Sequence, residues 1–160
     1  MQLGSNVRVC LKDACGVEVP ESVREGHNIL TDYGREWLRN LIVWDTLGAS
    51  DTPVEDRRLT RFVYGRGYQP ATRYVTWPAI YYTSYDVTAQ GVTTFPNSTT
   101  LRMEHTIGTG SGNGITFSEV GLALRKDLGS TENKLAFYKT FEPILKTSSF
   151  SLVTVWELKF

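Results

Sequence analysis

The chain has 160 residues, a length typical of one globular domain with a single core. Hydrophobic residues make up 41% of it and charged residues 21%, which excludes the disordered class. Lys and Arg together number 17, as do Asp and Glu, and both signs are scattered, so the positive patch of a nucleic-acid-binding protein is missing. We therefore predict one domain over residues 1–160 that binds no nucleic acid.

The sequence gives no sign of a membrane-bound or exported chain. Residues 1–11 have polar and charged residues throughout and lack the apolar core of a signal peptide. No segment approaches the roughly 20 apolar residues that a membrane-spanning helix needs. We expect a soluble protein that is made in a cytoplasm and binds no membrane.

An N-terminal hairpin or arm is the first predicted element and covers residues 1–20. Its apolar residues alternate with polar ones in the period-two pattern of a half-buried strand. They are Val7, Val9 and Leu11, followed after a turn by Val17 and Val19. An exposed strand at this end would be a place for pairing with a neighbouring chain.

The cysteines and histidines do not show the spacing of a metal site. Cys10 and Cys15 could face each other across a turn, but two thiols make no disulfide framework. We expect free thiols, with a bridge or half of a metal site as the alternative. A zinc site would need two further ligands, and His27 and His105 are far apart in the sequence. We predict no metal and no cofactor.

One helix is predicted over residues 31–44. Its apolar residues recur at steps of three to five and are Tyr33, Trp37, Leu38, Leu41 and Ile42. Thr31 or Asp32 can cap the first turn by accepting a hydrogen bond from a backbone N–H. Because Gly34 weakens this turn, the helix should depend on packing its apolar stripe against a sheet. Residues 46–58 are expected to form an exposed loop.

Most of the remaining chain alternates with period two between turn residues. The predicted strands are Leu59–Gly65, Leu101–Ile107, Ile115–Leu124, Leu135–Phe141 and a last one from Phe150 to Phe160. Short strands at near-regular spacing favour a sandwich or barrel, and no βαβ alternation is present. We predict a mainly β fold: an antiparallel β-sandwich, jelly-roll-like, with one packed helix.

Aromatic residues concentrate in the middle third of the chain. The interface candidates are Trp77, Tyr81, Tyr82 and Tyr85, and Tyr64, Tyr68 and Tyr74 precede them. Such residues could form a contact patch or stack on sugars, because Tyr and Trp suit surfaces that are apolar on one side and wet on the other. Ordinary strand packing is the alternative. Since Tyr81 and Tyr82 are adjacent, at least one of them should leave the core.

No catalytic residue is predicted, and we expect no enzymatic activity. The run Gly108–Gly114 lacks the lysine and the following helix of a phosphate-binding loop, so we interpret it as a flexible connection. No nucleophile elbow or convincing triad is present. Glu104, Glu119 and Glu157 lie on predicted strands, where a solvated face or a buried link to an arginine is favoured over a catalytic carboxylate pair.

Three segments resemble virion proteins of tailed bacteriophages. Residues 28–38 read Asn-Ile-Leu-Thr-Asp-Tyr-Gly-Arg-Glu-Trp-Leu, and residues 59–67 read Leu-Thr-Arg-Phe-Val-Tyr-Gly-Arg-Gly. They resemble small virion proteins in which an Asn-hydrophobic-x-Thr-x-x-Gly helix start precedes a strand ending in Gly-x-Gly. Residues 115–122, Ile-Thr-Phe-Ser-Glu-Val-Gly-Leu, are similar to the I-T-E-V-G-L signature of tail-fibre attachment domains, lengthened by Phe117-Ser118.

The resemblance implies a structural protein of the virion whose partners are other virion proteins. A free-standing domain fits a capsid cement or decoration protein, and a tail-fibre, neck or baseplate adaptor is the close alternative. We expect a homo-oligomer, and capsid symmetry suggests a trimer. From the aromatic residues and the sandwich alone, a carbohydrate-binding module is a more remote alternative, and a small hydrolase using carboxylates is another.

Overall fold

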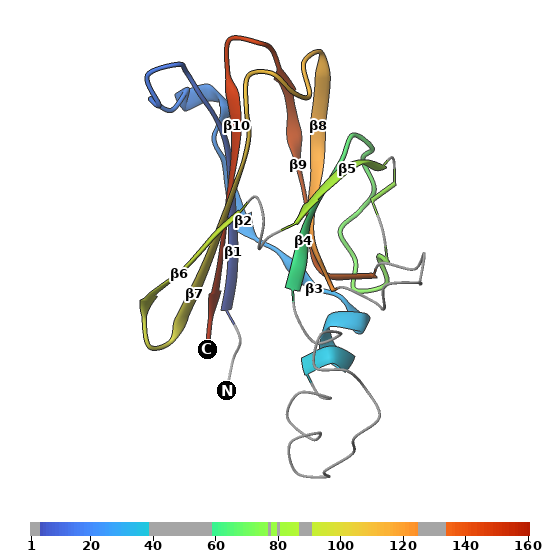
Figure 1. Ribbon diagram of the computed structural model, residues 1–160. Helices are drawn as coiled ribbons and strands as arrows, with labels where there is room; N and C mark the ends of the chain where they lie inside the picture. The colour runs from blue at the N-terminus through green and yellow to red at the C-terminus, as the bar shows by residue number, and fades with distance from the viewer. Residues whose placement is uncertain (1–3, 39–58, 77, 80, 87–90, 125–133) are drawn as a thin grey trace.

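The computed structural model describes residues 4–38, 59–76, 78–79, 81–86, 91–124 and 134–160. Within them, ten strands form two antiparallel sheets packed face to face (Figure 1). The strands are β1 (Gly4–Lys12), β2 (Arg24–His27), β3 (Ile29–Leu30), β4 (Leu59–Gly65), β5 (Tyr81–Asp86), β6 (Gly91–Asn97), β7 (Thr100–Ile107), β8 (Ile115–Leu124), β9 (Lys134–Lys146) and β10 (Ser151–Lys159). A 3-10 helix covers Pro20–Ser22, and an α-helix is described over residues 32–38.

Sheet A has the strand order β2-β1-β10-β7-β6, and sheet B has the order β3-β9-β8-β4-β5. The predicted mainly β fold and β-sandwich are therefore confirmed. The jelly-roll connectivity is not confirmed, because the sequence-consecutive pairs β4–β5, β6–β7 and β8–β9 each stay within one sheet. By these strand orders, each sheet has two edge strands.

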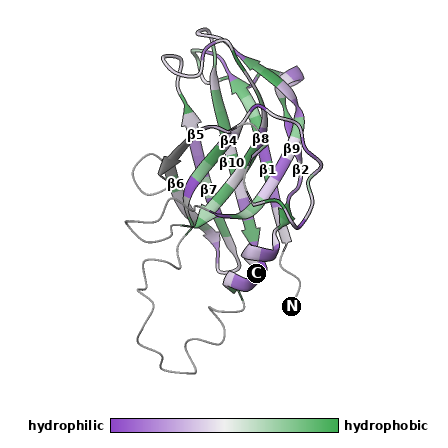
Figure 2. Cartoon of the chain, turned by 90° about the vertical axis from the view of Figure 1, so that its right-hand side faces the viewer, coloured by the Kyte–Doolittle hydropathy of each residue, from purple (hydrophilic) through white to green (hydrophobic). Residues whose placement is uncertain are grey.

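The core between the sheets is built from buried residues of both sheets. Figure 2 shows hydrophobic and hydrophilic residues interspersed along the strands. The inner face of β10 carries the buried residues Leu152, Thr154, Trp156 and Leu158. The Trp156 ring lies 6.2 Å from that of Phe137 in the opposite sheet, and its Nε1 donates to Ser5 Oγ over 3.0 Å. Burial of each such large side chain contributes about 1.5–3 kcal/mol.

The helix begins where the sequence predicts. Gly34 N donates to Thr31 Oγ1 over 3.0 Å, so Thr31 is the N-cap. Tyr33 and Trp37 pack against the core, which supports so short a helix. The rest of the predicted helix and the loop at 46–58 lie outside the described residues.

The N-terminal segment forms the predicted strand but not a free arm. Val19 N donates to Leu11 O over 2.9 Å, so the chain turns back as expected. However, β1 pairs with β10 on one side and with β2 on the other. Residues 6–9 of β1 are paired on both sides, so they have no free edge for strand addition by a neighbour. Strand addition elsewhere in residues 1–19 stays a prediction.

Candidate binding surface

The structure separates the four interface candidates. Tyr82 packs edge to face on Phe117, with ring centroids 5.4 Å apart, so it belongs to the core. Tyr81 is 46% exposed, as the alternation of adjacent strand residues predicts. Trp77 lies outside the described residues, and Tyr85 lies on β5 opposite Phe62 but its side chain is not described.

The segment between β4 and β5 exposes two further tyrosines, Tyr68 and Tyr74. Tyr74 borders a shallow hollow of about 340 Å³. The guanidinium of Arg73 lies 4.8 Å from the Tyr74 ring centroid and donates to its hydroxyl over 2.8 Å. Arg73 also pairs with Asp32 at 3.7 Å, which links this segment to the start of the helix.

Glu119 on β8 holds the segment between β4 and β5 in place through hydrogen bonds. Its side chain is fully buried and accepts hydrogen bonds from Gly67 N and Ala79 N, both over 2.9 Å, and from the Tyr138 hydroxyl. Burial raises the pKa of Tyr138, so the phenol keeps the proton that it donates. A Cβ on Gly65 would lie 2.7 Å from Pro78 Cβ and closer still to Glu119 Oε2. This carboxyl group is a structural fastener.

Residues 28–38, 59–67 and 115–122, which were singled out from the sequence, meet in sheet B. Residues 59–65 form β4 and pair with β8, which contains residues 115–122. The Ser118 hydroxyl donates to Gly67 O, so the Gly-x-Gly end of one segment is bound to the signature of another. Residues 28–38 reach β9 through Thr31, whose N–H donates to Ala136 O over 3.0 Å. The residues of the three segments thus form one hydrogen-bonded framework in sheet B.

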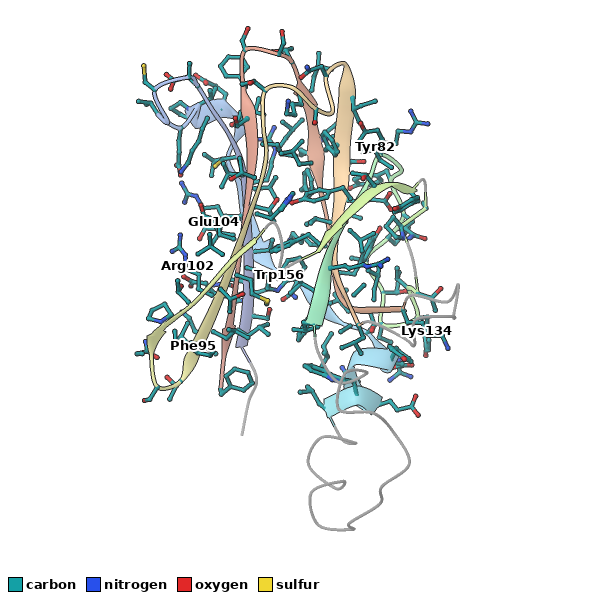
Figure 3. All side chains as sticks on the ribbon, viewed as in Figure 1. Tyr82, Phe95, Arg102, Glu104, Lys134 and Trp156 are labelled. Atoms are coloured by element: carbon teal, nitrogen blue, oxygen red, sulfur yellow. The ribbon has the colours of Figure 1, made fainter. Side chains whose placement is uncertain are left out.

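The other two carboxylates named from the sequence lie on the outer face of sheet A. Glu104 and Glu157 flank Arg102, at 3.2 Å and 3.6 Å from its guanidinium (Figure 3). A solvated, arginine-paired role is therefore confirmed for them. Glu119 differs from that expectation because it lies in the core, where backbone N–H groups and a phenol bind it.

A second set of ion pairs lies on the same outer face of sheet A. Arg8 lies 2.5 Å from Glu18 and 3.0 Å from Glu25. The hydrogen bond from Arg8 lowers the pKa of Glu18, so both partners stay charged. Cys10 and these charged residues line one hollow of about 310 Å³. Burial raises the pKa of the Cys10 thiol. Both cysteines are free, as predicted.

The glycine run connects β7 to β8, as predicted, but it forms a turn that is hydrogen-bonded to the end of β9. Lys146 Nζ, which is fully buried, donates to Asn113 Oδ1 over 2.9 Å, and Gly114 N donates to Lys146 O over 2.8 Å. Burial lowers the pKa of Lys146. The turn is therefore fastened to the end of β9, and this lysine serves the fold.

His105 forms a polar contact between the two sheets. The hydroxyl of Tyr64, on β4, lies 3.0 Å from His105 Nδ1 and donates to Thr154 Oγ1 on β10 over 3.0 Å. The Phe62 ring stacks on the imidazole at 5.5 Å. Burial lowers the pKa of His105 to about 4, so the imidazole is neutral at pH 7.

We expect this histidine to make the fold acid-sensitive. Because its pKa falls from 6.5 to about 4 on folding, the unfolded chain binds the proton first, and stability is lost as the pH falls from about 6.5 to 4. The loss amounts to about 3 kcal/mol. Urea unfolding of the wild type and of His105→Gln across this range measures it. His105→Gln should lack this pH-dependent loss of stability, whereas His27→Gln, which changes an exposed histidine, should keep it.

Exposed apolar side chains mark a different part of the molecule. Residues 92–99, which include most of β6, are all exposed, and among them Val92 is 62% and Phe95 75% exposed. Figure 3 shows Phe95 on the β6–β7 hairpin, on the side of sheet A away from sheet B. The sequence prediction missed β6. This strand and the Tyr68–Tyr74 segment are the candidate binding surfaces.

Comparisons with protein-family models, curated proteins and solved structures found no match for this chain. Across the described residues, no group of three or more His, Cys, Asp or Glu side chains is placed to hold a metal ion. None of the helices in the part of the chain that the structure describes is long and apolar enough to cross a membrane.

Proposed function

We propose that this chain is a bacteriophage virion protein that binds and stabilises the assembled particle as a capsid cement or decoration protein. The observation that carries the proposal is the packing of the three resembling segments into one framework in sheet B. Glu119 and Ser118 bind the backbone of Gly67, and Thr31 binds the backbone of β9, which pairs with β8. A protein of this kind needs a rigid body and adhesive surfaces, because it stabilises the particle by binding only its assembled state.

A role without catalysis is part of the proposal. The carboxylates considered for acid–base chemistry have other partners: Glu119 accepts from backbone N–H groups, and Glu104 and Glu157 share Arg102. The buried His105 is hydrogen-bonded to Tyr64. These contacts support structural uses for each group. The partners that we propose are other virion proteins and further copies of this chain.

An adaptor in the tail, neck or baseplate is the alternative within the same class. It is favoured by residues 115–122, whose resemblance is to tail-fibre attachment domains. The two locations differ in where the chain would be found after virions are separated into heads and tails.

A carbohydrate-binding module is supported by the β-sandwich and by the exposed Tyr68, Tyr74 and Tyr81. Because Tyr82 packs on Phe117, its replacement would damage the core rather than test sugar binding. Tyr74→Ala is the better variant. If this alternative holds, binding on a glycan array should be seen for the wild type and lost in the variant.

Add-back of the purified chain to particles tests the proposed function. Particles would be purified from cells in which the gene for this chain is deleted. We expect saturable binding of the added chain and a rise in the temperature at which the particles release their DNA. Particles that bind none of the added chain, and that are as heat-stable as the complete ones, would exclude a cement role.

A further inference from the structure

The edges of the two sheets differ in how they resist pairing with another chain. In sheet A, β2 carries Arg24, Glu25 and His27, and in sheet B, β3 has only two residues. Charged side chains and short length are common protections of an edge strand. The remaining edge of sheet B, β5, ends at Asp86. By contrast β6, the second edge of sheet A, has seven residues and no charge.

The β6 edge also exposes the apolar side chains that a protein contact would bury. Phe95 and Val92 are 75% and 62% exposed, and Phe95 is the most exposed large apolar side chain among the described residues. Unpaired backbone groups next to exposed apolar side chains make an edge strand a template for another strand. Pro96 has no N–H, so in a twofold pair it limits the ladder at both ends and leaves the middle of the strand to pair.

We propose that β6 pairs with β6 of a second copy of this chain, antiparallel and across a twofold axis. Charge favours this occupant, because a strand without charged residues meets an identical strand without like-charge repulsion. A twofold contact uses the same patch on both copies and closes on itself. The trimer suggested by capsid symmetry would instead need β6 to meet a different edge: the charged β2, the two-residue β3, or β5, which ends at Asp86.

The sequence of β6 is suited to such a contact. A closed twofold pair of antiparallel strands places one residue opposite its own copy, and Thr94 is the middle residue of β6. With the axis at Thr94, the Thr94 side chains of the two copies lie opposite each other, and Thr–Thr cross-strand pairs are favourable. The register of β6 with β7 shifts between Thr94 and Asn97, so Phe95 and Pro96 lie in the irregular part of the strand. The two five-stranded A sheets would then form one continuous sheet.

Val92→Lys is the decisive variant, and Val17→Lys is its matched control. The two valines are 62% and 61% exposed, and Val17 lies in the turn after β1. Sedimentation velocity over a concentration series should show a dimer for the wild type and for Val17→Lys. For Val92→Lys and Phe95→Lys the dissociation constant should rise about tenfold or more, with the unfolding temperature unchanged at concentrations where both proteins are monomeric. Hydrogen exchange should show β6 amides protected in the dimer and unprotected in Val92→Lys.

Three results would overturn the pairing: a wild-type monomer at every concentration, equal weakening of the dimer by Val17→Lys and Val92→Lys, or a dimer whose β6 amides stay unprotected. The inference does not depend on the proposed role in a virion. A Val92→Lys monomer that still binds particles would support the pairing and the particle role separately. A dimer that binds no particle would support the pairing alone.

Discussion

Replacing Glu119 with alanine should lower the free energy of unfolding by about 3–5 kcal/mol. The substitution removes the acceptor of Gly67 N–H, Ala79 N–H and the Tyr138 hydroxyl at a fully buried position. Each buried donor left without a partner costs about 1–3 kcal/mol. The measurement is equilibrium unfolding in urea with the midpoint and slope fitted together.

Glu104→Ala is the matched control for this prediction. Glu104 is also a strand glutamate, but it is about one-third exposed and pairs with Arg102 at the surface, so its loss should cost less than about 1 kcal/mol. Glu119→Gln should fall between the two, because one amide oxygen can replace only one carboxyl oxygen. Equal, small losses for Glu119→Ala and Glu104→Ala would contradict the fastening role of Glu119.

Gly34→Ala should destabilise the protein by about 3 kcal/mol, although alanine is the better helix former by about 1 kcal/mol. A Cβ at this position would lie 2.9 Å from the backbone carbon of Ala136, 2.8 Å from Leu30 Cδ1, and still closer to Ala136 O. The backbone of β9 cannot move away without breaking the Thr31 contacts. Thermal and urea unfolding measure the sign of the change.

Gly108→Ala provides the comparison for Gly34→Ala. An added Cβ at Gly108 meets no atom within 4 Å, so its effect should be within about 1 kcal/mol of zero. If Gly34→Ala proved as stable as the wild type or more stable, the close approach of the helix to β9 would be wrong.

The strands that the sequence predicted best are β4 and β8, which lie inside sheet B and are buried over most of their length. Leu59–Gly65 and Ile115–Leu124 match β4 and β8 residue for residue. Residues such as Phe62 and Phe117 are fully buried in the core. Buried positions require apolar side chains, and the recurrence of these side chains is the signal from which the strands were predicted. The prediction of the helix start at Thr31 succeeded for a different reason, because a cap is a local interaction.

The missed strands lack that signal. No residue of β6 with a described side chain is buried. The strand therefore has no buried face that would require apolar residues at every second position of its sequence. The strands β2 and β3 are too short to show a period. The end of β9 was predicted too early, since Pro143 usually ends a strand. It is tolerated because three residues, 141–143, lie opposite Ser118 alone, between the pairs Phe117–Ile144 and Glu119–Thr140.

The environment of Glu119 could not be predicted from its neighbours in the sequence. Its donors lie at residues 67, 79 and 138, and only the pairing of β4, β8 and β9 brings them together. The available signal was the Gly-x-Gly end of residues 59–67, because glycine permits the close approach that a buried carboxyl group needs. The split between Tyr81 and Tyr82 was predictable from strand geometry, but the direction of each ring was not.

The copy number of this chain in purified particles, separated into heads and tails, tests the proposed virion role most directly. Quantitative mass spectrometry should find the chain in the head fraction, at a fixed ratio to the major capsid protein. Recovery only with tails would contradict the capsid role and favour the adaptor. Absence from both fractions, with the chain found only in the particle-free lysate, would contradict the virion role altogether.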